Sequence, residues 1–140
     1  MRGRSTSATC LIQIARSAAT LTAARDGHRR IVAVFQPHRY TRTRALWRSL
    51  GESLTSADVV VVTDVYGAGE PPIPGVTGKL VVDGLSEAVP AKRILYLPKR
   101  PAVVQFLLAE MGPGDLVITL GAGDITTVAE EVMDRARASA

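Results

Sequence analysis

Short apolar runs alternate along this chain with segments of helical periodicity. The runs Ile31-Val-Ala-Val34 and Val59-Val-Val-Val62 contain no polar residue, which is typical of strands buried on both faces of a parallel sheet. Asp115-Leu-Val-Ile-Thr-Leu120 is nearly as apolar. The pattern predicts four strands, over residues 31–35, 58–64, 93–97 and 115–120.

Between these runs, apolar residues recur three and four positions apart, as in amphipathic helices. The first such segment covers residues 13–25, where Ile14, Ala18 and Leu21 share a face, and it ends near Gly27. Further helices are expected over residues 41–55, around Leu80, Val81 and Leu85, from Pro101 with a core face of Val103, Val104, Leu107, Leu108 and Met111, and after Asp124. Alternating strands and helices predict an α/β domain with a Rossmann-like, mostly parallel sheet flanked by helices.

Polar residues mark where the helices are expected to begin. A Ser, Thr, Asp or Asn at the N-cap accepts a hydrogen bond from a backbone N–H of the first turn. Thr41 or Thr43 fits this position for the second helix, and Thr77 fits it for the third. Asp124 fits it for the last helix, with Thr127 and Glu130 as an alternative capping box.

Three loops are expected to meet at the carboxyl edge of the sheet: residues 36–43, 64–75 and 121–126. Ligands of open α/β sheets bind at this edge, and a helix N-terminus there adds free N–H groups and a partial positive charge. The first loop enters its helix through His38, Arg39 and Arg42, so the sequence predicts an anion-binding site. Gly121 and Gly123 would let the backbone of the third loop approach a ligand closely.

The net charge of +4 arises in the first 25 residues. This segment holds four basic residues and no acidic one: Arg2, Arg4, Arg16 and Arg25. The rest of the chain is neutral, which argues against a nucleic-acid-binding domain because such a domain needs a basic face. Arg44 and Arg48 lie four positions apart and are expected on a solvated helix face.

The composition excludes several classes of protein. A length of 140 residues suits one domain with a sizeable core, and the chain has no apolar run of the roughly 18 residues that a membrane span needs. The single Cys10 excludes an internal disulfide and suits a reducing, cytoplasmic location. Paired Cys and His ligands, a P-loop, a full dinucleotide fingerprint and a Gly-x-Ser-x-Gly elbow are all absent from the sequence. We therefore expect anion-binding loops, no metal site and no complete catalytic apparatus.

The three loops lie in long blocks of distinctive sequence. The blocks read Phe35-Gln-Pro-His-Arg-Tyr-Thr-Arg-Thr-Arg44, Asp64-Val-Tyr-Gly-Ala-Gly-Glu-Pro-Pro-Ile-Pro-Gly75 and Gly114-Asp-Leu-Val-Ile-Thr-Leu-Gly-Ala-Gly-Asp124. Together they resemble the C-terminal domain of the Mur ligase family, and within it the UDP-N-acetylmuramate–L-alanine ligases (MurC) of bacterial peptidoglycan synthesis. The resemblance runs from about Ala18 to about Val132, and the matching domain is expected over residues 18–140.

The resemblance implies one domain of a three-domain ligase. One domain would hold the UDP-sugar, and a second would be the ATPase, with a P-loop. This third domain would close over the site, contribute to binding the amino acid and contact the nucleotide. ATP would phosphorylate the lactyl carboxylate of UDP-N-acetylmuramate, and the amine of L-alanine would then attack the resulting acyl phosphate. ATP and Mg²⁺ would serve the full-length enzyme, and neither is expected to bind tightly to this domain alone. Neither nucleic acid nor a membrane is an expected partner.

The resemblance also implies roles for individual residues. His38, Arg39 and Arg42 would position L-alanine and steady nearby negative charge, which agrees with the bidentate fit of a guanidinium to a carboxylate. An alternative of equal weight is that His38 only shapes the turn. The secondary candidates are Asp64, Tyr66, Gly121, Gly123 and Asp124, and for Asp64 a role in bracing its loop stays open.

The first 17 residues depart from the family. The family's third domain opens with an Asp-Tyr-Ala-His-His-Pro-type motif, whereas this chain reads Ser7-Ala-Thr-Cys-Leu-Ile-Gln-Ile-Ala-Arg16. We interpret residues 1–17 as a non-matching leader and a candidate for disorder. It is either the start of a truncated or frame-shifted reading frame, which we favour, or a targeting leader. Without UDP-sugar and ATPase domains the chain is expected to be inactive alone, and the alternative function is a stand-alone, non-catalytic anion- or nucleotide-binding module.

Overall fold

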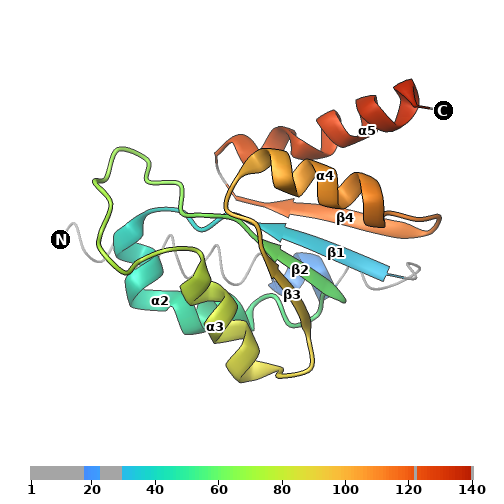
Figure 1. The fold of residues 1–140 in the computed structure, drawn as a ribbon. Helices are drawn as coiled ribbons and strands as arrows, with labels where there is room; N and C mark the ends of the chain where they lie inside the picture. The colour runs from blue at the N-terminus through green and yellow to red at the C-terminus, as the bar shows by residue number, and fades with distance from the viewer. Residues whose placement is uncertain (1–17, 23–29, 122, 140) are drawn as a thin grey trace.

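Four parallel strands form the centre of the fold in this computed structural model, which describes residues 18–22, 30–121 and 123–139. They are β1 (Arg30–Phe35), β2 (Val59–Val62), β3 (Arg93–Tyr96) and β4 (Asp115–Leu120). Their order across the sheet is β3-β2-β1-β4, so β1 and β2 are the inner strands (Figure 1). Val34 of β1 lies opposite Val61 on one side and Thr119 on the other. The predicted strands and their parallel arrangement are confirmed.

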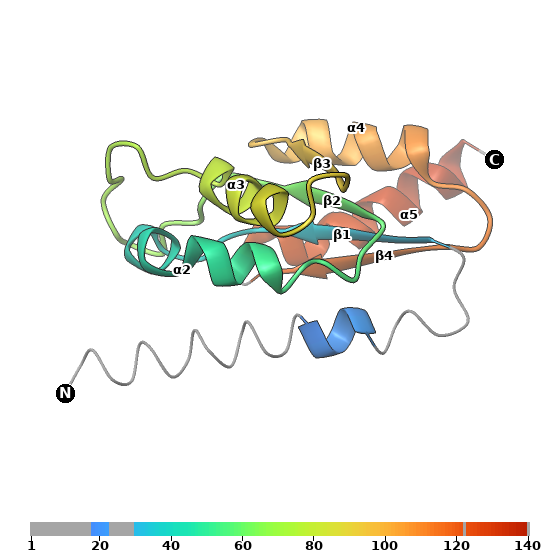
Figure 2. The same cartoon turned by 90° about the horizontal axis from the view of Figure 1, so that it is seen from below.

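Helices cover both faces of the sheet (Figures 1 and 2). One face carries α2 (Tyr40–Glu52), α3 (Lys79–Ala88) and the helical residues 18–22. The other face carries α4 (Arg100–Glu110) and α5 (Val128–Ala138), and a short 3-10 helix, η1 (Asp124–Thr127), leads into α5. This three-layer arrangement confirms the predicted Rossmann-like α/β class.

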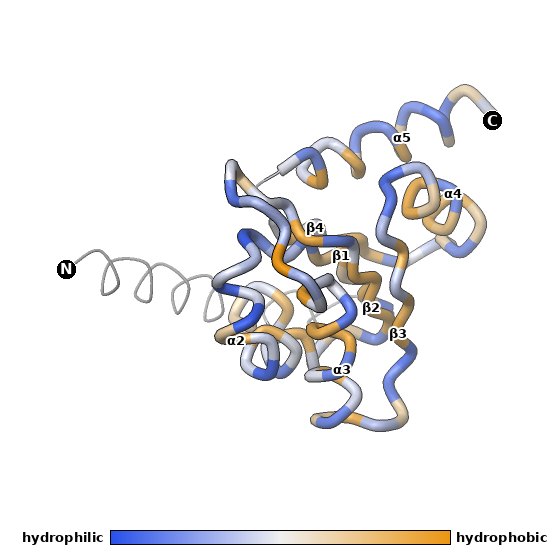
Figure 3. The backbone as a smooth tube through the Cα atoms, turned by 60° about the vertical axis from the view of Figure 1, so that its left-hand side comes forward, coloured by the Kyte–Doolittle hydropathy of each residue, from blue (hydrophilic) through white to orange (hydrophobic). Residues whose placement is uncertain are grey.

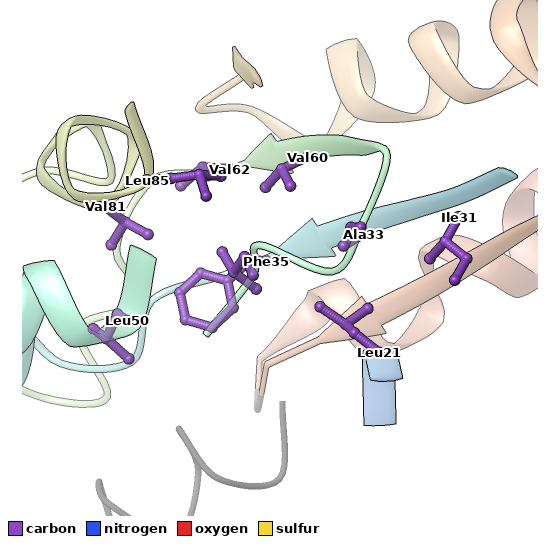
Figure 4. Packing of buried hydrophobic residues seen from close by; sticks show 11 residues of the cluster. Leu21, Ile31, Ala33, Phe35, Leu50, Val60, Val62, Val81 and Leu85 are labelled. Atoms are coloured by element: carbon purple, nitrogen blue, oxygen red, sulfur yellow. The ribbon is translucent and has the colours of Figure 1, made fainter. Parts of the chain in front are cut away.

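The core lies in two layers because successive strand side chains point to opposite faces of the sheet. From β1, Ile31, Ala33 and Phe35 pack toward α2 and α3, whereas Val32 and Val34 pack toward α4 and α5. Figure 4 shows Phe35 between the sheet and α2, and Figure 3 shows that hydrophobic residues concentrate in the strands. All five side chains are at most 1% exposed, and burying one the size of Val, Ile or Phe contributes about 1.5–3 kcal/mol.

Two glycines allow α2 and α3 to pack with their backbones in contact. A Cβ atom on Gly51 would lie 2.4 Å from the backbone N of Leu85, and one on Gly84 would lie 2.6 Å from the carbonyl O of Trp47. Both separations are far shorter than van der Waals contact, so neither position has room for a larger residue. The close crossing anchors α2, whose N-cap is Arg39 and whose first turn carries Arg42.

The start of α2 differs from the prediction. Its N-cap is Arg39, and the predicted N-caps, Thr41 and Thr43, both lie inside the first turn. The Thr43 hydroxyl donates to the carbonyl O of Arg39 at 2.8 Å, and the Thr41 hydroxyl donates to Glu70 at 2.6 Å. The tertiary structure decides this, because the Arg39 N–H is bound to the carbonyl O of Tyr66 and the helix begins at the next residue.

The predicted start of the last helix is confirmed only in part. Asp124 begins η1, and Thr127 occupies the N-cap position of α5 without a side-chain cap bond. The Thr127 hydroxyl donates to the carbonyl O of Asp124 at 2.9 Å, so the capping box with Glu130 does not form. The cause is the 3-10 turn, which brings a hydroxyl within reach of the carbonyl three residues earlier.

Smaller differences concern α3 and α4. The N-cap of α3 is Gly78 rather than Thr77, although the Thr77 hydroxyl accepts the N–H of Lys79 at 3.2 Å. The predicted core face of α4 is buried or half-buried except for Leu108, which is 38% exposed because it lies at the margin of the face that packs on the sheet. None of the described helices is long and apolar enough to cross a membrane.

Part of the predicted first helix lies outside the described residues. Residues 18–22 are helical, and Leu21 is fully buried in the same core layer as Phe35. The remainder of residues 13–25, the leader over residues 1–17 and Cys10 belong to the part of the chain that the structure does not describe.

Candidate functional site

The three predicted loops meet at the carboxyl edge of the sheet. The first two pair as a short parallel bridge, in which the Tyr66 N–H donates to the carbonyl O of Pro37 and the Arg39 N–H donates to the carbonyl O of Tyr66, both at 2.8 Å. The third loop is close to the second, since a Cβ atom on Gly123 would lie 3.0 Å from the Tyr66 ring. Candidate residues that are far apart in the sequence therefore share one place in the fold.

Gln36 joins the first loop to the third, and the sequence analysis missed it. Its side-chain amide donates to Asp124 Oδ1 at 3.1 Å, and its Oε1 accepts the Gly123 N–H at 3.1 Å. The side chain is 7% exposed. A glutamine directly after a fully apolar strand was the available signal, because a polar side chain at a buried position needs hydrogen-bond partners.

His38, Arg42 and Tyr66 form one cluster. Arg42 Nη1 donates to His38 Nδ1 at 3.3 Å, because a guanidinium carries only donors. The imidazole also stacks on the Tyr66 ring, with ring centroids 5.9 Å apart and 15° between the planes. Since Nδ1 accepts, the proton of the neutral imidazole lies on Nε2.

The surroundings of His38 favour this neutral form. Burial lowers the pKa of His38, the positive charges of Arg42 and Arg39 lower it further, and Glu70 opposes them. At neutral pH the ring is therefore an uncharged acceptor that orients Arg42. This contact gives His38 a side-chain partner within the cluster, in addition to its place in the turn.

Arg39 and Arg42 present unsatisfied donors. The Nε atoms of both side chains are buried and have no hydrogen-bond partner among the described residues. A buried donor on a charged group costs free energy unless an acceptor reaches it, so such atoms are a good place to look for a ligand. Arg39 also has φ 69° and ψ 139°, a strained conformation for a residue with a side chain, and such strain is frequent at functional sites.

The N-terminus of α2 is not free for a ligand, contrary to what the sequence suggests. Glu70 accepts the Thr41 N–H at 3.2 Å through Oε1 and the Thr41 hydroxyl at 2.6 Å through Oε2. The Thr41 hydroxyl is the largest influence that lowers the pKa of Glu70. A carboxylate of the chain itself thus occupies the positive end of the helix, which leaves the two guanidinium groups for an external anion.

Asp64 has structural partners. Its Oδ1 accepts the N–H of Val65 at 2.8 Å and the N–H of Gly78, the N-cap of α3, at 3.3 Å. These bonds tie the second loop to the start of α3, which supports the bracing role left open by the sequence. Its charge also acts on Tyr96, whose pKa is raised first by burial and then by Asp64.

The candidate glycines of the third loop make room for Gln36. A Cβ atom on Gly121 would lie 3.0 Å from Gln36 Cβ and 2.7 Å from a methyl group of Ile125, and one on Gly123 would lie 2.7 Å from Gln36 Oε1. Their small size is therefore used by the protein's own packing. Asp124 is held by Gln36 in the same contact.

The arginines outside the cluster face solvent or other partners. Arg44 is exposed, and Arg48 is an exposed residue paired with Glu87 at 3.2 Å, which confirms the solvated face predicted for both. Arg30 lies at the other end of β1 and donates to Asp115 at 2.7 Å. Among the arginines of residues 30–121 and 123–139 discussed above, Arg39 and Arg42 are the ones that lie with His38.

A candidate metal site is absent from the described residues. They contain no group of three or more His, Cys, Asp or Glu side chains that could hold a metal ion. Asp64 and Glu70, the acidic side chains of the second loop, are engaged with backbone N–H groups and a hydroxyl. The cluster suits a small organic anion that carries its own two acceptor oxygens.

Replacing Gln36 with leucine is expected to loosen the third loop. The Gly123 N–H would lose its acceptor, and we expect the free energy of unfolding to fall by about 1–3 kcal/mol. Chemical denaturation measures the loss, and amide exchange should report faster exchange at Gly123. The matched control is Gln105→Leu on an exposed position of α4, where the change should stay within about 0.5 kcal/mol. Equal losses in both variants would contradict the proposed link.

The pKa of His38 is expected to depend on Arg42. NMR titration should give a value below the ordinary histidine value, and Arg42→Ala should raise it, because a neighbouring positive charge is removed. Arg44→Ala is the control and should leave the pKa of His38 unchanged. The chain has two histidines, so a His28→Gln variant identifies which NMR signals belong to His38. Because the unfolded chain binds this proton more tightly, stability should decrease as the pH falls below about 6.5. A His38 pKa that ignores Arg42 would contradict the contact.

The sequence is similar to a known family and to several bacterial enzymes. Residues 13–123 match the family described as Mur ligase, glutamate ligase domain. A UDP-N-acetylmuramate–L-alanine ligase of Rubrobacter xylanophilus is 54% identical over 117 residues, which are 84% of this chain and 26% of that protein. The enzyme of the same name from Mycobacteroides abscessus is 47% identical over 84% of this chain and 23% of its own length. The chain thus spans about a quarter of the length of the curated relatives it matches.

The fold is also similar to a solved structure. That structure is described as a domain of a UDP-N-acetylmuramate:L-alanyl-γ-D-glutamyl-meso-diaminopimelate ligase from Haemophilus ducreyi. The TM-score between the two folds is 0.59, and the sequences are 19% identical. The similarity covers 87% of this chain and 82% of that one. At this level of identity it establishes the fold and carries nothing about ligands.

Proposed function

This chain belongs to the Mur ligase family, and from that premise we propose that it is the amino-acid-binding domain of an ATP-dependent UDP-N-acetylmuramate–L-alanine ligase. The domain comprises residues 18–140 and is inactive alone. The parent enzyme acts in the cytoplasm in peptidoglycan biosynthesis, and so serves cell shape and cell division. The name of the Rubrobacter xylanophilus relative describes the whole enzyme, and the match with this chain covers 26% of its length.

The observation that carries the proposal is the pair of buried Nε atoms on Arg39 and Arg42, which have no hydrogen-bond partner within the described part of the chain. Both belong to guanidinium groups, which can hold the two oxygens of one carboxylate through parallel hydrogen bonds. The N-terminus of α2 is already occupied by Glu70, so an incoming anion would meet the arginine side chains. The carboxylate of L-alanine has the size and charge for this role.

His38 and Tyr66 act in this proposal as positioning residues. The neutral imidazole accepts from Arg42 Nη1 and stacks on Tyr66, which leaves the remaining donors of Arg42 available for the substrate. The held carboxylate would orient the amine of L-alanine toward the activated carboxyl group of the sugar. The two positive charges would also stabilise the negative charge that develops there.

ATP and Mg²⁺ would be held tightly only in the full-length enzyme, mainly by its other domains, with this domain contacting the nucleotide. The described residues present no cluster of acidic side chains for the metal, so no step of the reaction is assigned to them through ATP. Bound elsewhere, ATP would supply the phosphoryl group that activates the lactyl carboxylate. UDP-N-acetylmuramate would likewise be held by another domain.

A domain replacement tests the proposal. Residues 18–140 take the place of the corresponding quarter of the Rubrobacter xylanophilus relative, and phosphate release is measured with UDP-N-acetylmuramate, ATP and L-alanine. We expect release that requires all three substrates. A folded chimera that binds the UDP-sugar but releases no phosphate would contradict the proposal. Tight nucleotide binding by the isolated chain would favour the stand-alone module instead.

A further inference from the structure

Two strained residues lie where the first and second loops meet. Arg39 has φ 69° and Ala68 has φ 52°, and these are the two residues other than glycine with a positive φ in the part of the chain that the structure describes. Such a conformation costs free energy for a residue with a Cβ atom, so it persists only where the surrounding contacts impose it. The junction of the two loops must therefore contain contacts that hold both residues in place.

Hydrogen bonds anchor the backbone on both sides of Arg39. Its own N–H donates to the carbonyl O of Tyr66 at 2.8 Å. Two residues later, the Thr41 N–H donates to Glu70 at 3.2 Å and the Thr41 hydroxyl donates to it at 2.6 Å. Figures 1 and 2 show the loop between β2 and α3 reaching the start of α2. The strained φ is a rotation between two N–H groups that this loop holds.

A tight turn presents Glu70 to α2. The Glu70 N–H donates to the carbonyl O of Gly67 at 3.1 Å, and the central residues Ala68 and Gly69 both have positive φ, as in a type I′ turn. A Cβ atom on Gly67 would lie 3.0 Å from the Tyr40 ring, so the turn packs closely on the first residue of α2. The strained Ala68 thus belongs to the element that places the carboxylate.

The negative charge of Glu70 does not explain its place beside an anion-binding pair. The Thr41 hydroxyl, and to a lesser extent the charge of Arg39, lower the pKa of Glu70, so the carboxylate is ionised at neutral pH. Its two oxygens bind Thr41, while the Nε atoms of Arg39 and Arg42 have no partner among the described residues. A carboxylate here repels an incoming anion. Its hydrogen bonds, rather than its charge, account for the arrangement.

We propose that Glu70 is a positioning residue for the carboxylate-binding arginines and does not itself contact the substrate. By holding the N–H and the hydroxyl of Thr41, it keeps Arg39 in its strained conformation and so fixes where the Arg39 guanidinium lies relative to Arg42. The inference rests on the proposed role of these arginines in binding L-alanine. Because the site is ordered before the substrate arrives, binding requires less ordering of side chains and loops.

Two variants of Glu70 separate hydrogen-bond geometry from charge. Glu70→Gln keeps an acceptor for the Thr41 N–H and a donor for its hydroxyl oxygen, whereas Glu70→Ala keeps neither, and both remove the negative charge. In the chimeric ligase, Glu70→Ala should raise the KM for L-alanine by about tenfold or more, because the arginines lose their fixed position. Glu70→Gln should leave this KM within about twofold of the original, or lower it. The KM values for UDP-N-acetylmuramate and ATP should not change in either variant.

Two further variants complete the comparison. Glu52→Ala removes an exposed carboxylate at the other end of α2 and is the matched control, which should change no KM by more than about twofold. Thr41→Val weakens the same contact from the helix side and should raise the KM for L-alanine by about threefold. Combined with Glu70→Ala it should add nothing, because the two residues act through one contact.

NMR of the full chain tests the inference without catalysis. The Cα and Cβ chemical shifts of Arg39 report its backbone conformation. They should move toward ordinary values in Glu70→Ala and stay in place in Glu70→Gln. If alanine at position 70 unfolds the chain, the smaller shift expected in Thr41→Val gives the same information.

Equal increases in KM for Glu70→Gln and Glu70→Ala would overturn the inference, because the charge would then act directly on the amine of the substrate. A KM for L-alanine that Glu70→Ala leaves unchanged overturns it as well, as does an Arg39 whose chemical shifts ignore that variant. A chimera that releases no phosphate contradicts the proposed function instead. In that case the NMR comparison still decides whether Glu70 positions Arg39.

Discussion

Alanine at position 78 is expected to destabilise the chain by about 3 kcal/mol or more, or to prevent folding. A Cβ atom on Gly78 would lie 1.9 Å from the carbonyl O of Thr63, at the end of β2, and 3.1 Å from the Tyr96 ring. The start of α3 would have to move away from the sheet. That movement would also lengthen the bond between the Gly78 N–H and Asp64.

The backbone at Gly78 makes this test specific for packing. Its φ of −57° and ψ of −21° are ordinary helical values, which alanine adopts more readily than glycine. Intrinsic propensity therefore predicts a small gain, and only the tertiary contact predicts a large loss. Chemical denaturation gives the size of the effect, and two-dimensional NMR shows whether the second loop has moved.

Gly112→Ala is the matched control for Gly78→Ala. A Cβ atom there would meet only Asp115 Oδ2, at 3.7 Å, which is an ordinary contact. Its free energy of unfolding should stay within about 0.5 kcal/mol of the original. If both variants changed stability by the same amount, the close contact between Gly78 and Thr63 would not be the cause.

The second large effect is expected in the chimeric ligase that carries residues 18–140. Arg39→Ala and Arg42→Ala together should lower kcat/KM for L-alanine by about a thousandfold, because each guanidinium supplies charge-assisted hydrogen bonds of about 1.5–3 kcal/mol. Part of this loss should appear as a higher KM for L-alanine, whereas the KM values for UDP-N-acetylmuramate and ATP should stay unchanged. Initial rates of phosphate release, with each substrate varied in turn, measure this difference.

The arginines on the exposed part of α2 provide the comparison. Arg44→Ala and Arg48→Ala remove the same number of positive charges a few residues away, and the rate should change by less than about threefold. Activity that survives the loss of Arg39 and Arg42 would remove both from the site. An equal decrease in kcat/KM for all three substrates would indicate a folding defect. The thermal transition of the double variant would reveal such a defect.

The strands and their parallel arrangement could be predicted, because an apolar run without a polar face is stable only where both of its faces are covered. Val59 to Val62 has no polar face, so it had to be covered by helices on both sides, and it is. Which residues of the candidate site lie together was predictable in part. His38 and Arg42 lie four positions apart at a helix start, and they do interact. The Nε of Arg39 is buried without a partner among the residues of known placement, and its role in binding an anion stays a prediction.

The helix caps could not be predicted from local preference. A threonine near the start of a helix is a good N-cap in isolation, yet Thr41 and Thr43 hydrogen-bond elsewhere. Glu70, from the second loop, takes the first N–H of α2 that a cap would have satisfied. Competition between local and distant partners for the same donor is settled only when the loops have come together.

The chain by itself determined the alternation of strands and helices, the buried faces and the residues near the carboxyl edge, because these follow from hydrophobic periodicity. The tertiary structure alone decided which polar groups are paired there. Gln36 bridges two loops that are far apart in sequence, Glu70 occupies the positive end of α2, and Gly78 leaves room for the carbonyl of Thr63. Each of these three contacts joins segments that are far apart in the sequence. No local sequence pattern encodes how close such segments lie in the fold.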